Sequence, residues 1–340
     1  MQKIAALLCE QIAEDIGSVS CKEVDLADPG EGEIQVRLKA CAVNFPDILM
    51  IQGKYQFKPP MPFSPGGEAS GEVVALGAGV TEFREGDPVV LGMRYGGFAE
   101  AINVTVDKAR LVPKGMDFAK AASYQTAYLT AYVALRRRGH LESGETLLVH
   151  GATGGVGMAA VDLGKHFGAT VIGTGGRDDK LEVVKRMGAD HVINYSQTNG
   201  TLGGFREEVK ALTDGRGADV IYDPVGGDVF DESMRCINWG GRILTIGFTS
   251  GRWPQAPVNL ILIKQIAVIG VRAGEYGRRD PVRGRENSDA LYAMAERGQI
   301  DPHISHSMPL EKAVEAMRLL ENREVIGKAV VTMNGWSRDT

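Results

Sequence analysis

The sequence lacks the features that mark membrane and secreted proteins. No apolar run in its 340 residues approaches the roughly 20 residues that a membrane-spanning helix needs. The best candidate, Leu260 to Val271, is interrupted by Lys264 and Gln265. Acidic residues directly follow the short apolar patch at the N-terminus, unlike in a secretory signal. The four cysteines show no CxxC spacing and no disulfide framework. We therefore expect a cytoplasmic protein with no membrane partner.

An excess of basic charge is also missing. The chain carries 38 Lys and Arg against 43 Asp and Glu, a net charge of −5, whereas a dedicated nucleic-acid binder normally presents a basic stripe. The sequence has no internal repeat and no low-complexity tract. What remains is the composition of an ordinary globular protein, long enough for two domains and without a nucleic-acid partner.

Glycine is abundant, with 44 residues, well above the average share of roughly 7%. Because glycine costs conformational entropy, such an excess indicates tight turns or a close approach of backbone to a ligand.

The first 125 residues read as β structure. Glu33 to Cys41 alternates apolar and polar residues, and Ser70 to Leu76 and Asp87 to Leu91 read similarly. Turn signals at residues 77–79 and 85–87 separate them. We expect a compact antiparallel or barrel-like domain here.

From about residue 130 strands and helices alternate. This rhythm predicts an α/β domain with a doubly wound parallel sheet. The six expected strands are Thr146–His150, Thr170–Thr174, His191–Asn194, Asp219–Tyr222, Arg242–Ile246 and Ile266–Gly270. Asp178 is expected to cap a helix over 179–187 that ends at Gly188. Beyond the sheet we expect helices over 288–297 and 310–321 and a closing strand over 328–332.

A glycine-rich loop follows the first of these strands. Ala152-Thr-Gly154-Gly155-Val156-Gly157 lies between an expected strand and an expected helix, which is the context that a dinucleotide-binding loop requires. Glycines allow the backbone to approach a pyrophosphate, which the free N–H groups of the helix N-terminus stabilise. Ala152 replaces the usual first glycine. The alternative is a plain tight turn between strand and helix.

The end of the second strand bears on the choice of cofactor. Folds that prefer NAD place a carboxylate there to bind the ribose 2′-hydroxyl, but this chain has Thr174, Gly175, Gly176 and Arg177. Arg177, with Lys180 one turn later and Tyr195 past the third strand, could bind a 2′-phosphate, so the pattern favours NADPH. If Arg177 or Lys180 is considered alone, the simpler interpretation is a solvent-exposed residue at the start of a helix.

Six stretches together resemble a known superfamily. They are residues 43–55 (VNFPDILMIQGKY), 66–68 (GGE), 130–132 (TAY), 150–157 (HGATGGVG), 188–195 (GADHVINY) and 222–227 (YDPVGG). The chain resembles the medium-chain dehydrogenase/reductase superfamily and, within it, the quinone oxidoreductase branch of the zeta-crystallin type. The resemblance implies a GroES-like β-rich catalytic domain formed by residues 1–125 and 272–340, and a Rossmann domain formed by residues 126–271.

The zinc ligands of related alcohol dehydrogenases are replaced in this sequence. By resemblance, their first cysteine falls at Asn44, their histidine at Gly67 before Glu68, and their third ligand near Thr126. The cysteine-rich structural-zinc lobe is absent as well. Because zinc needs three or four Cys, His or carboxylate ligands, we expect no metal site.

The resemblance also assigns contacts to the nicotinamide end of the cofactor. Asn44 would hold the carboxamide or ribose, Thr130 would contact the ring end, and Val225 and Phe248 would line the pocket. The alternatives for Asn44, Thr130 and Phe248 are a turn-stabilising Asn, a helix Thr and a core Phe.

Tyr55 is the candidate for proton transfer. Its surroundings, Met50-Ile-Gln-Gly-Lys-Tyr55, resemble those in mitochondrial-type enoyl thioester reductases, where a tyrosine is taken to donate the proton that follows hydride addition. A phenol is a plausible general acid toward an enolate. A rim tyrosine without chemistry is the alternative.

Two further features bear on partners. Five arginines crowd a loop-like stretch after the sixth strand, and a solvated loop or subunit contact is favoured over a coenzyme A site. They are Arg272, Arg278, Arg279, Arg283 and Arg285. By resemblance, the strand over 266–270 is the sheet edge that pairs in a homodimer.

These observations predict an NADPH-dependent, zinc-free oxidoreductase that reduces quinones such as naphthoquinones. Without a metal to polarise an alcohol, reduction of an electron-poor small-molecule acceptor is the accessible chemistry. The alternatives are an enoyl-thioester or enone double-bond reductase and a cofactor-binding protein whose catalysis is vestigial.

Overall fold

The computed structural model describes residues 2–196 and 204–338. It divides into two compact units, one formed by residues 1–125 and 301–340 and the other by residues 126–300. The expected second boundary, after residue 271, differs from this division. The helices that follow the sheet stay with the second unit, where Arg137 bonds to Asn287 and Glu286 at 2.7 and 2.9 Å.

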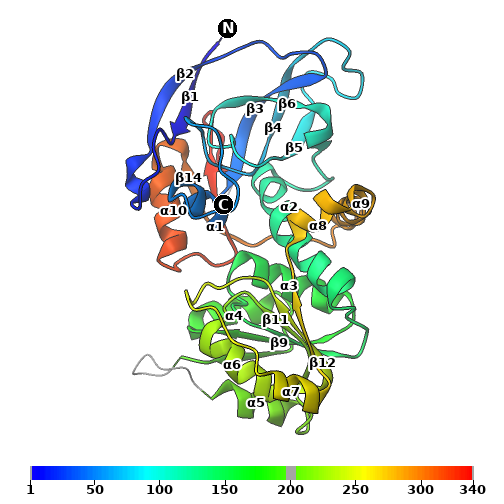
Figure 1. The fold of residues 1–340 in the computed structure, drawn as a ribbon. Helices are drawn as coiled ribbons and strands as arrows, with labels where there is room; N and C mark the ends of the chain where they lie inside the picture. The colour runs from blue at the N-terminus through cyan, green and yellow to red at the C-terminus, as the bar shows by residue number, and fades with distance from the viewer. Residues whose placement is uncertain (1, 197–203, 339–340) are drawn as a thin grey trace. The chain divides into compact units, whose positions relative to one another are not determined.

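The first unit is built mainly from antiparallel strands, with one parallel pair, β14 and β15 (Figure 1). Its main sheet has the order β14-β15-β3-β4-β5-β7, with β6 also paired to β3, and β1 and β2 form a separate pair. The elements are β1 (Gln2–Leu8), β2 (Ser20–Leu26), β3 (Glu33–Ala42), α1 (Phe45–Ile51), β4 (Glu68–Leu76), β5 (Pro88–Gly92), β6 (Ala101–Thr105), β7 (Ala109–Leu111), β14 (Ile304–Pro309), α10 (Ala313–Glu321) and β15 (Lys328–Thr332).

Strand β3 shows why the sequence folds in this way. Its alternate residues Ile34, Val36 and Leu38 are fully buried in the core of the unit, whereas Arg37 is exposed. Strand side chains point alternately to opposite faces, and the face opposite these three is covered in part, since Gln35 is buried and Arg37 exposed. The β-rich first domain is confirmed.

The second unit is a parallel sheet of six strands in the order β10-β9-β8-β11-β12-β13, surrounded by helices (Figure 1). The doubly wound sheet predicted from the alternation is confirmed. The helix α2 (Phe118–Tyr132) leads into this unit. Its elements are β8 (Thr146–Val149), α3 (Gly155–His166), β9 (Thr170–Gly175), α4 (Asp178–Arg186), β10 (His191–Asn194), α5 (Phe205–Leu212), β11 (Ala218–Asp223), α6 (Gly227–Cys236), β12 (Ile237–Thr245), α7 (Val258–Lys264), β13 (Ala267–Gly270), α8 (Ala273–Arg279) and α9 (Pro281–Glu296).

The strand order contains one switch point. The chain runs outward from β8 through β9 to β10 and then returns to β11 on the other side of β8. Ligands of such sheets bind outside the carboxyl ends of the strands at this point. The fold therefore directs attention to the loops that follow β8 and β11.

Some predicted boundaries need correction. Arg177, not Asp178, precedes the first residue of α4, and the Arg177 side chain does not cap the helix. Helix α9 begins at Pro281, earlier than the expected residue 288, because Asp280 caps it by accepting from the Arg283 N–H. The left-handed backbone expected at Gly188 is present, with φ 113°. Among the described helices, none is both long and apolar enough to cross a membrane.

Candidate functional site

The glycine loop lies at the switch point of the second unit. Gly151 adopts a positive φ of 56°, its carbonyl accepts from the Gly154 N–H at 3.0 Å, and Gly154 precedes α3. An ideal Cβ on Gly157 would lie 2.2 Å from the Gly151 carbonyl oxygen, so position 157 requires glycine for the loop to close. On Gly154 a Cβ would meet only that oxygen, at 3.5 Å. The structure thus forms the tight loop that the motif predicted.

The N-terminus of α3 can receive an anion. Among the described residues no side chain caps it, and its first turn, which holds Gly155, Val156 and Gly157, contains no acidic residue. The first N–H groups of a helix have no partner within the helix and carry partial positive charge. These features fit the pyrophosphate of a dinucleotide.

His150 and Thr174 support the loop from within the core. The two imidazole nitrogens of fully buried His150 lie 2.8 Å from Thr174 Oγ1 and from Ser233 Oγ. Because Ser233 donates to the Val229 carbonyl, it accepts from Nε2–H, and Thr174 then donates to Nδ1. Burial lowers the pKa of His150 to about 3, so the ring stays neutral.

This arrangement corrects the expectation for Thr174. Its side chain is fully buried and its hydroxyl is used by His150, while its carbonyl accepts from the Ala152 N–H at 3.0 Å. Thr174 therefore positions the glycine loop and has no surface for a ligand.

Asp223 organises the second loop, which follows β11. Its Oδ1 accepts from the N–H groups of Val225 and Gly226 at 2.8 and 2.9 Å. Its Oδ2 is buried and has no hydrogen-bond partner among the described residues. Burial raises the pKa of Asp223 to about 6, against the lowering effect of the two N–H donors. Asp223 was missed from the sequence, although a carboxylate ending a buried strand could have marked it.

The loops after β8, β11 and β12 lie against one another. A Cβ atom added to Gly151 would lie 3.4 Å from Val225 Cγ2, and a Cβ atom added to Gly226 would lie 3.0 Å from Phe248 Cδ1. The Val225 carbonyl accepts from the Ser250 N–H at 3.0 Å. The Phe248 ring is 42% exposed, so it is not a core residue. The structure brings Val225 and Phe248 together with the glycine loop.

The carboxyl ends of β9 and β10 gather the residues expected at the 2′-phosphate. The Tyr195 N–H donates to the Gly175 carbonyl at 3.0 Å, which places Tyr195 beside Gly176 and the start of α4. The Arg177 guanidinium is exposed and makes two bonds to Asp179, at 3.0 and 2.6 Å. Lys180 is only 5% exposed, so it is not a solvent-exposed residue at the start of the helix.

Thr130 lies on α2, in the same unit. Its hydroxyl donates to the Thr126 carbonyl at 2.7 Å, one turn earlier. This backbone contact is what an ordinary helix threonine makes.

The first unit contains a buried cluster of charged groups around Asn44. Lys328 Nζ lies 2.6 Å from Asn44 Oδ1 and 2.9 Å from Glu68 Oε1, and Asn44 Nδ2 lies 3.0 Å from the same Glu68 oxygen. Glu68 and Lys328 are 1% and 5% exposed. Sequence reasoning missed Lys328, and the only signal was a charged residue at the start of an otherwise apolar closing strand.

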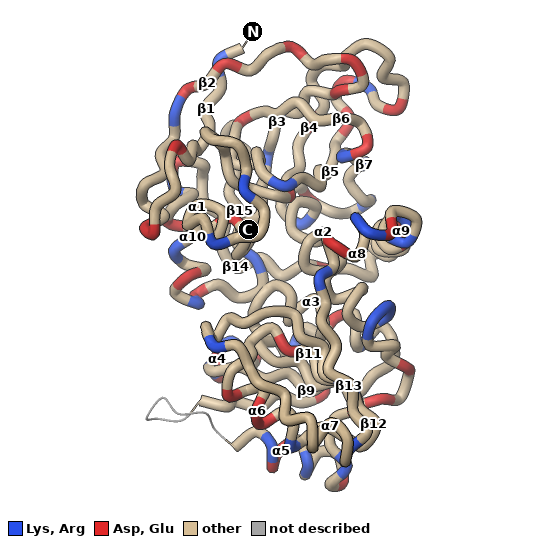
Figure 2. Tube along the Cα trace, viewed as in Figure 1, with Lys and Arg blue, Asp and Glu red and all other residues tan. Residues whose placement is uncertain are grey.

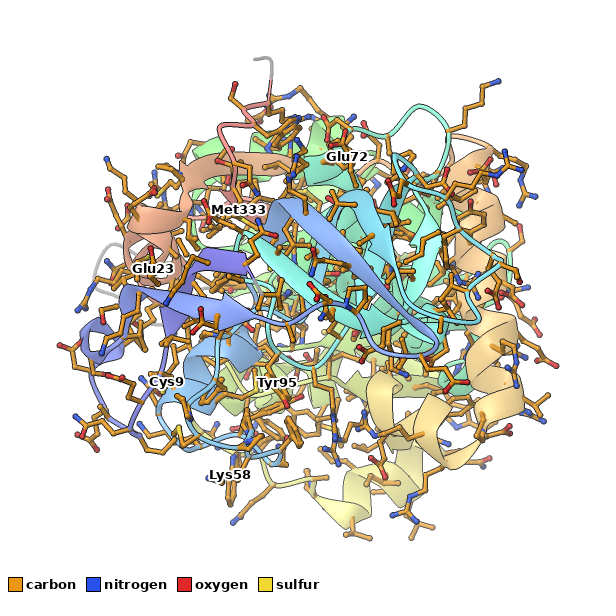
Figure 3. All side chains as sticks on the ribbon, turned by 90° about the horizontal axis from the view of Figure 1, so that it is seen from above. Cys9, Glu23, Lys58, Glu72, Tyr95 and Met333 are labelled. Atoms are coloured by element: carbon orange, nitrogen blue, oxygen red, sulfur yellow. The ribbon has the colours of Figure 1, made fainter. Side chains whose placement is uncertain are left out.

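Asn44 precedes the first residue of α1, and Tyr55 follows the C-terminal end of that helix. Its N–H donates to the Leu49 carbonyl at 3.1 Å, and its side chain packs partly buried on the core of the first unit. Phe57, two residues on, stacks against Tyr95 with 6.0 Å between ring centroids. Figure 3 labels Tyr95, and it also labels Lys58, which follows Phe57 in the chain. The structure therefore places Tyr55 and Asn44 at opposite ends of one short helix.

The arginine-rich stretch is helical, not the loop that was expected. Arg272, Arg278 and Arg279 all pair with Glu275, and Arg283 pairs with Asp280. Figure 2 shows acidic and basic positions close together along α8 and α9. Four of the five arginines thus have a carboxylate partner within the stretch.

The residues described here do not fit a zinc ion. Over residues 2–196 and 204–338, no group of three or more His, Cys, Asp or Glu side chains could hold a metal. Asn44 is bonded to an ammonium group, which would repel a cation.

Comparison with known proteins identifies the family. A model described as "Alcohol dehydrogenase GroES-like domain" matches residues 30–114, and one described as "Zinc-binding dehydrogenase" matches residues 155–284. A quinone oxidoreductase-like protein 2 homolog from Nematostella vectensis is 38% identical, covering 96% of this chain and 88% of that protein. The chain belongs to the medium-chain dehydrogenase/reductase superfamily.

Other members of the superfamily are similar over nearly the whole chain. Quinone oxidoreductase-like protein 2 of Mus musculus is 34% identical, covering 96% of this chain and 92% of that protein. The Escherichia coli quinone oxidoreductase solved with NADPH has a TM-score of 0.84 and 30% identity, covering 96% of this chain and 99% of that chain. The JamJ enoyl reductase has a TM-score of 0.82 and 27% identity, covering 98% of this chain and 100% of that chain. The protein is therefore an oxidoreductase of this superfamily, although the zinc named in its second family model has no ligand set among the described residues.

Proposed function

We propose that the protein is an NADPH-dependent reductase of quinones that works without zinc. The observation that carries this proposal is the switch-point loop of the second unit, with its uncapped α3 N-terminus and no carboxylate at the end of β9. The names of the similar quinone oxidoreductases, one of them solved with NADPH, support the same reading.

The choice of NADPH over NADH depends on Arg177. Its present partner is the exposed carboxylate of Asp179, and exposed ion pairs contribute only about 0.2–1 kcal/mol. A charge-assisted bond to a phosphate contributes about 1.5–3 kcal/mol. A 2′-phosphate can therefore replace Asp179 as the partner of Arg177, and Lys180 and Tyr195 would lie beside that phosphate.

The bound cofactor would supply a hydride. The chain would orient the cofactor and the substrate. The glycine loop and α3 would hold the phosphates, and Val225 and Phe248 would line the pocket at the nicotinamide end. Asn44 would offer its amide to an oxygen of a ligand. With no three-ligand set for a Lewis acid among the described residues, the best substrates are acceptors that are already electron-poor, such as quinones.

The deciding experiment combines a binding titration with an activity panel. We expect NADPH, followed by fluorescence, to bind at least about tenfold more tightly than NADH, and its absorbance to fall when naphthoquinones are added. Equal affinities would contradict the assignment of NADPH. If NADPH is consumed with enoyl thioesters but not with quinones, enoyl thioesters would replace quinones as the proposed substrate class.

An enoyl-thioester or enone reductase is the second candidate. Tyr55 on the segment after α1 favours it, as does the likeness to the JamJ enoyl reductase. Carbon–carbon reduction needs a proton after the hydride, and a phenol can donate one. A quinone in water needs no protein donor.

Tyr55→Phe separates the two candidates. We expect the variant to keep quinone turnover and to lose most turnover of any enoyl thioester that the wild type accepts. Tyr95→Phe, in the neighbouring aromatic group, is the matched control. Equal losses with both substrate classes would assign Tyr55 to packing.

We also propose that the protein forms a homodimer through β13. This strand ends the six-stranded sheet and has no partner on its outer edge among the described residues. An exposed strand edge can pair with a second copy across a two-fold axis.

A further inference from the structure

The Asn44 amide lies between a buried cation and a buried anion. Its oxygen lies 2.6 Å from Lys328 Nζ and its nitrogen 3.0 Å from Glu68 Oε1, while Lys328 and Glu68 lie 2.9 Å apart. The three groups come from the N-terminal side of α1 and from the first residues of β4 and β15. They form a closed triangle of hydrogen bonds.

This triangle permits only one orientation of the amide. Rotation of the side chain by 180° would place the NH₂ group against the Lys328 ammonium, which has no acceptor, and the oxygen against the Glu68 carboxylate, which has no donor. Both bonds would be lost in a buried setting, where unpaired polar groups are costly.

The backbone around Asn44 is fixed as well. Asp47, 1% exposed, accepts from the Asn44 N–H at 2.8 Å and from the Gly66 N–H at 3.0 Å. It thereby ties the start of α1 to the segment that leads into Glu68. Both the position and the orientation of the amide are set before any ligand binds.

One hydrogen of Asn44 Nδ2 remains for a ligand. Asn44 is half-buried, and within residues 2–196 and 204–338 its amide nitrogen makes one hydrogen bond, to Glu68. We propose that Lys328 and Glu68 are positioning residues that make Asn44 present an N–H donor, and never its oxygen, to an oxygen acceptor of the bound ligand. The inference rests on the proposed function only for the identity of that ligand, a quinone or enone carbonyl or the cofactor carboxamide.

The test reverses the polarity of the bond, and its double variant does so without changing the charge of the cluster. Asn44→Asp places a second carboxylate against Glu68 and removes the N–H. The double variant Asn44→Asp/Glu68→Gln keeps one carboxylate and one ammonium in the cluster, and its new amide at position 68 can donate to its new carboxylate at position 44. Glu68→Gln alone, which keeps the Asn44 N–H, is the matched control. All are measured at pH 8.

We expect Asn44→Asp to lower Tm and the double variant to recover most of that loss. Activity should not recover: kcat/KM of the double variant should stay roughly 10- to 100-fold below that of Glu68→Gln, the effect of losing one bond to the ligand. A raised Kd for NADPH would assign the bond to the cofactor, and a raised KM for the acceptor at unchanged Kd would assign it to the substrate. Wild-type kcat/KM in the double variant, or an equal Tm in the single and double variants, would overturn the proposal.

Lys328 has its own pair of variants. Lys328→Gln can offer either an oxygen or a nitrogen to Asn44 and so leaves only Glu68 to orient the amide, whereas Lys328→Arg offers only donors. We expect kcat/KM to fall severalfold in Lys328→Gln and to recover in Lys328→Arg, and equal values would overturn the role of Lys328. If the wild type reduces no quinone or enone, the proposed function fails, but the Tm comparison still decides whether the amide is oriented.

Discussion

At the residue scale, Arg177 is the side chain whose partner should change on binding. Its guanidinium is exposed and pairs with Asp179 in the first turn of α4. Because such a pair is weak, it competes only slightly with a ligand phosphate. Arg177 is therefore a better probe of cofactor choice than buried Lys180, whose replacement would also disturb packing.

We expect Arg177→Ala to raise the Kd of NADPH about tenfold or more and to leave that of NADH unchanged, because only NADPH carries the 2′-phosphate. Asp179→Asn should lower the Kd of NADPH severalfold by freeing Arg177. Fluorescence titration measures both. Arg186→Ala, at the other end of α4, is the control for general charge loss, and an equal effect there would contradict the assignment.

Asp223 gives the stability of the protein a specific pH dependence. Its pKa in the folded chain is about 6, above the ordinary value of 3.8, so folding favours the protonated acid. Stability from this group is fully present below about pH 4, its unfolded pKa, and is lost as pH rises to about 6. The loss is on the order of 3 kcal/mol, since one pKa unit corresponds to about 1.36 kcal/mol.

Asp223→Asn should remove this dependence. Asn Oδ1 can still accept from Val225 and Gly226, so the loop after β11 keeps its bonds. Urea unfolding between about pH 4 and pH 7 should show wild-type stability falling relative to the variant as pH rises. Parallel curves would show that Asp223 does not bind its proton more tightly in the folded state.

The candidate site residues that the sequence predicted are those whose neighbours lie close along the chain. Gly154, Gly157 and Arg177 belong to local strand–turn–helix patterns. Lys328 could not be found in this way, because its partners Asn44 and Glu68 are 284 and 260 residues away. Thr174 was misread for a related reason: its side chain direction depends on His150, and only the packed sheet shows that it points inward.

At the element scale, the strands were predicted where a run of apolar residues ends at clear turn signals. The predicted bounds of β10 and β15 match the structure. Strand β6, Ala101–Thr105, was not predicted, because it is short and pairs with β3 far away in the sequence. Helix α9 was predicted too short, since its first turns are rich in arginine and glycine and lack an apolar stripe.

Two glycines of the loop before α3 should respond differently to alanine. A Cβ on Gly157 would collide with the Gly151 carbonyl, so Gly157→Ala should lower the free energy of unfolding by about 1–3 kcal/mol. Gly154 has φ −88° and room for a Cβ, so Gly154→Ala should fold normally. Its methyl group would instead lie where the phosphates approach the helix and raise the Kd of NADPH about tenfold. Thermal unfolding and titration together test this, and a cofactor affinity unaffected by Gly154→Ala would move the phosphates elsewhere.

At the scale of the whole molecule, the second unit carries apolar surface that a lone copy leaves in water. All of α7, which leads into β13, is at least partly exposed. The large apolar side chains that α7 exposes are Val258, Leu262 and Ile263. Scattered exposed apolar residues need no explanation, but a group of them beside an open sheet edge indicates an interface.

Leu262→Glu/Ile263→Glu should therefore separate the proposed dimer into monomers. These two side chains are 77% and 69% exposed, so the substitutions cost little in an isolated copy but bury charge in an interface. Light scattering after size exclusion should give the dimer mass for the wild type and the monomer mass for the variant, at similar Tm. Leu212→Glu, an exposed apolar position at the end of α5, controls for added charge. A wild type that is monomeric at micromolar concentration would leave β13 unpaired and would contradict the homodimer.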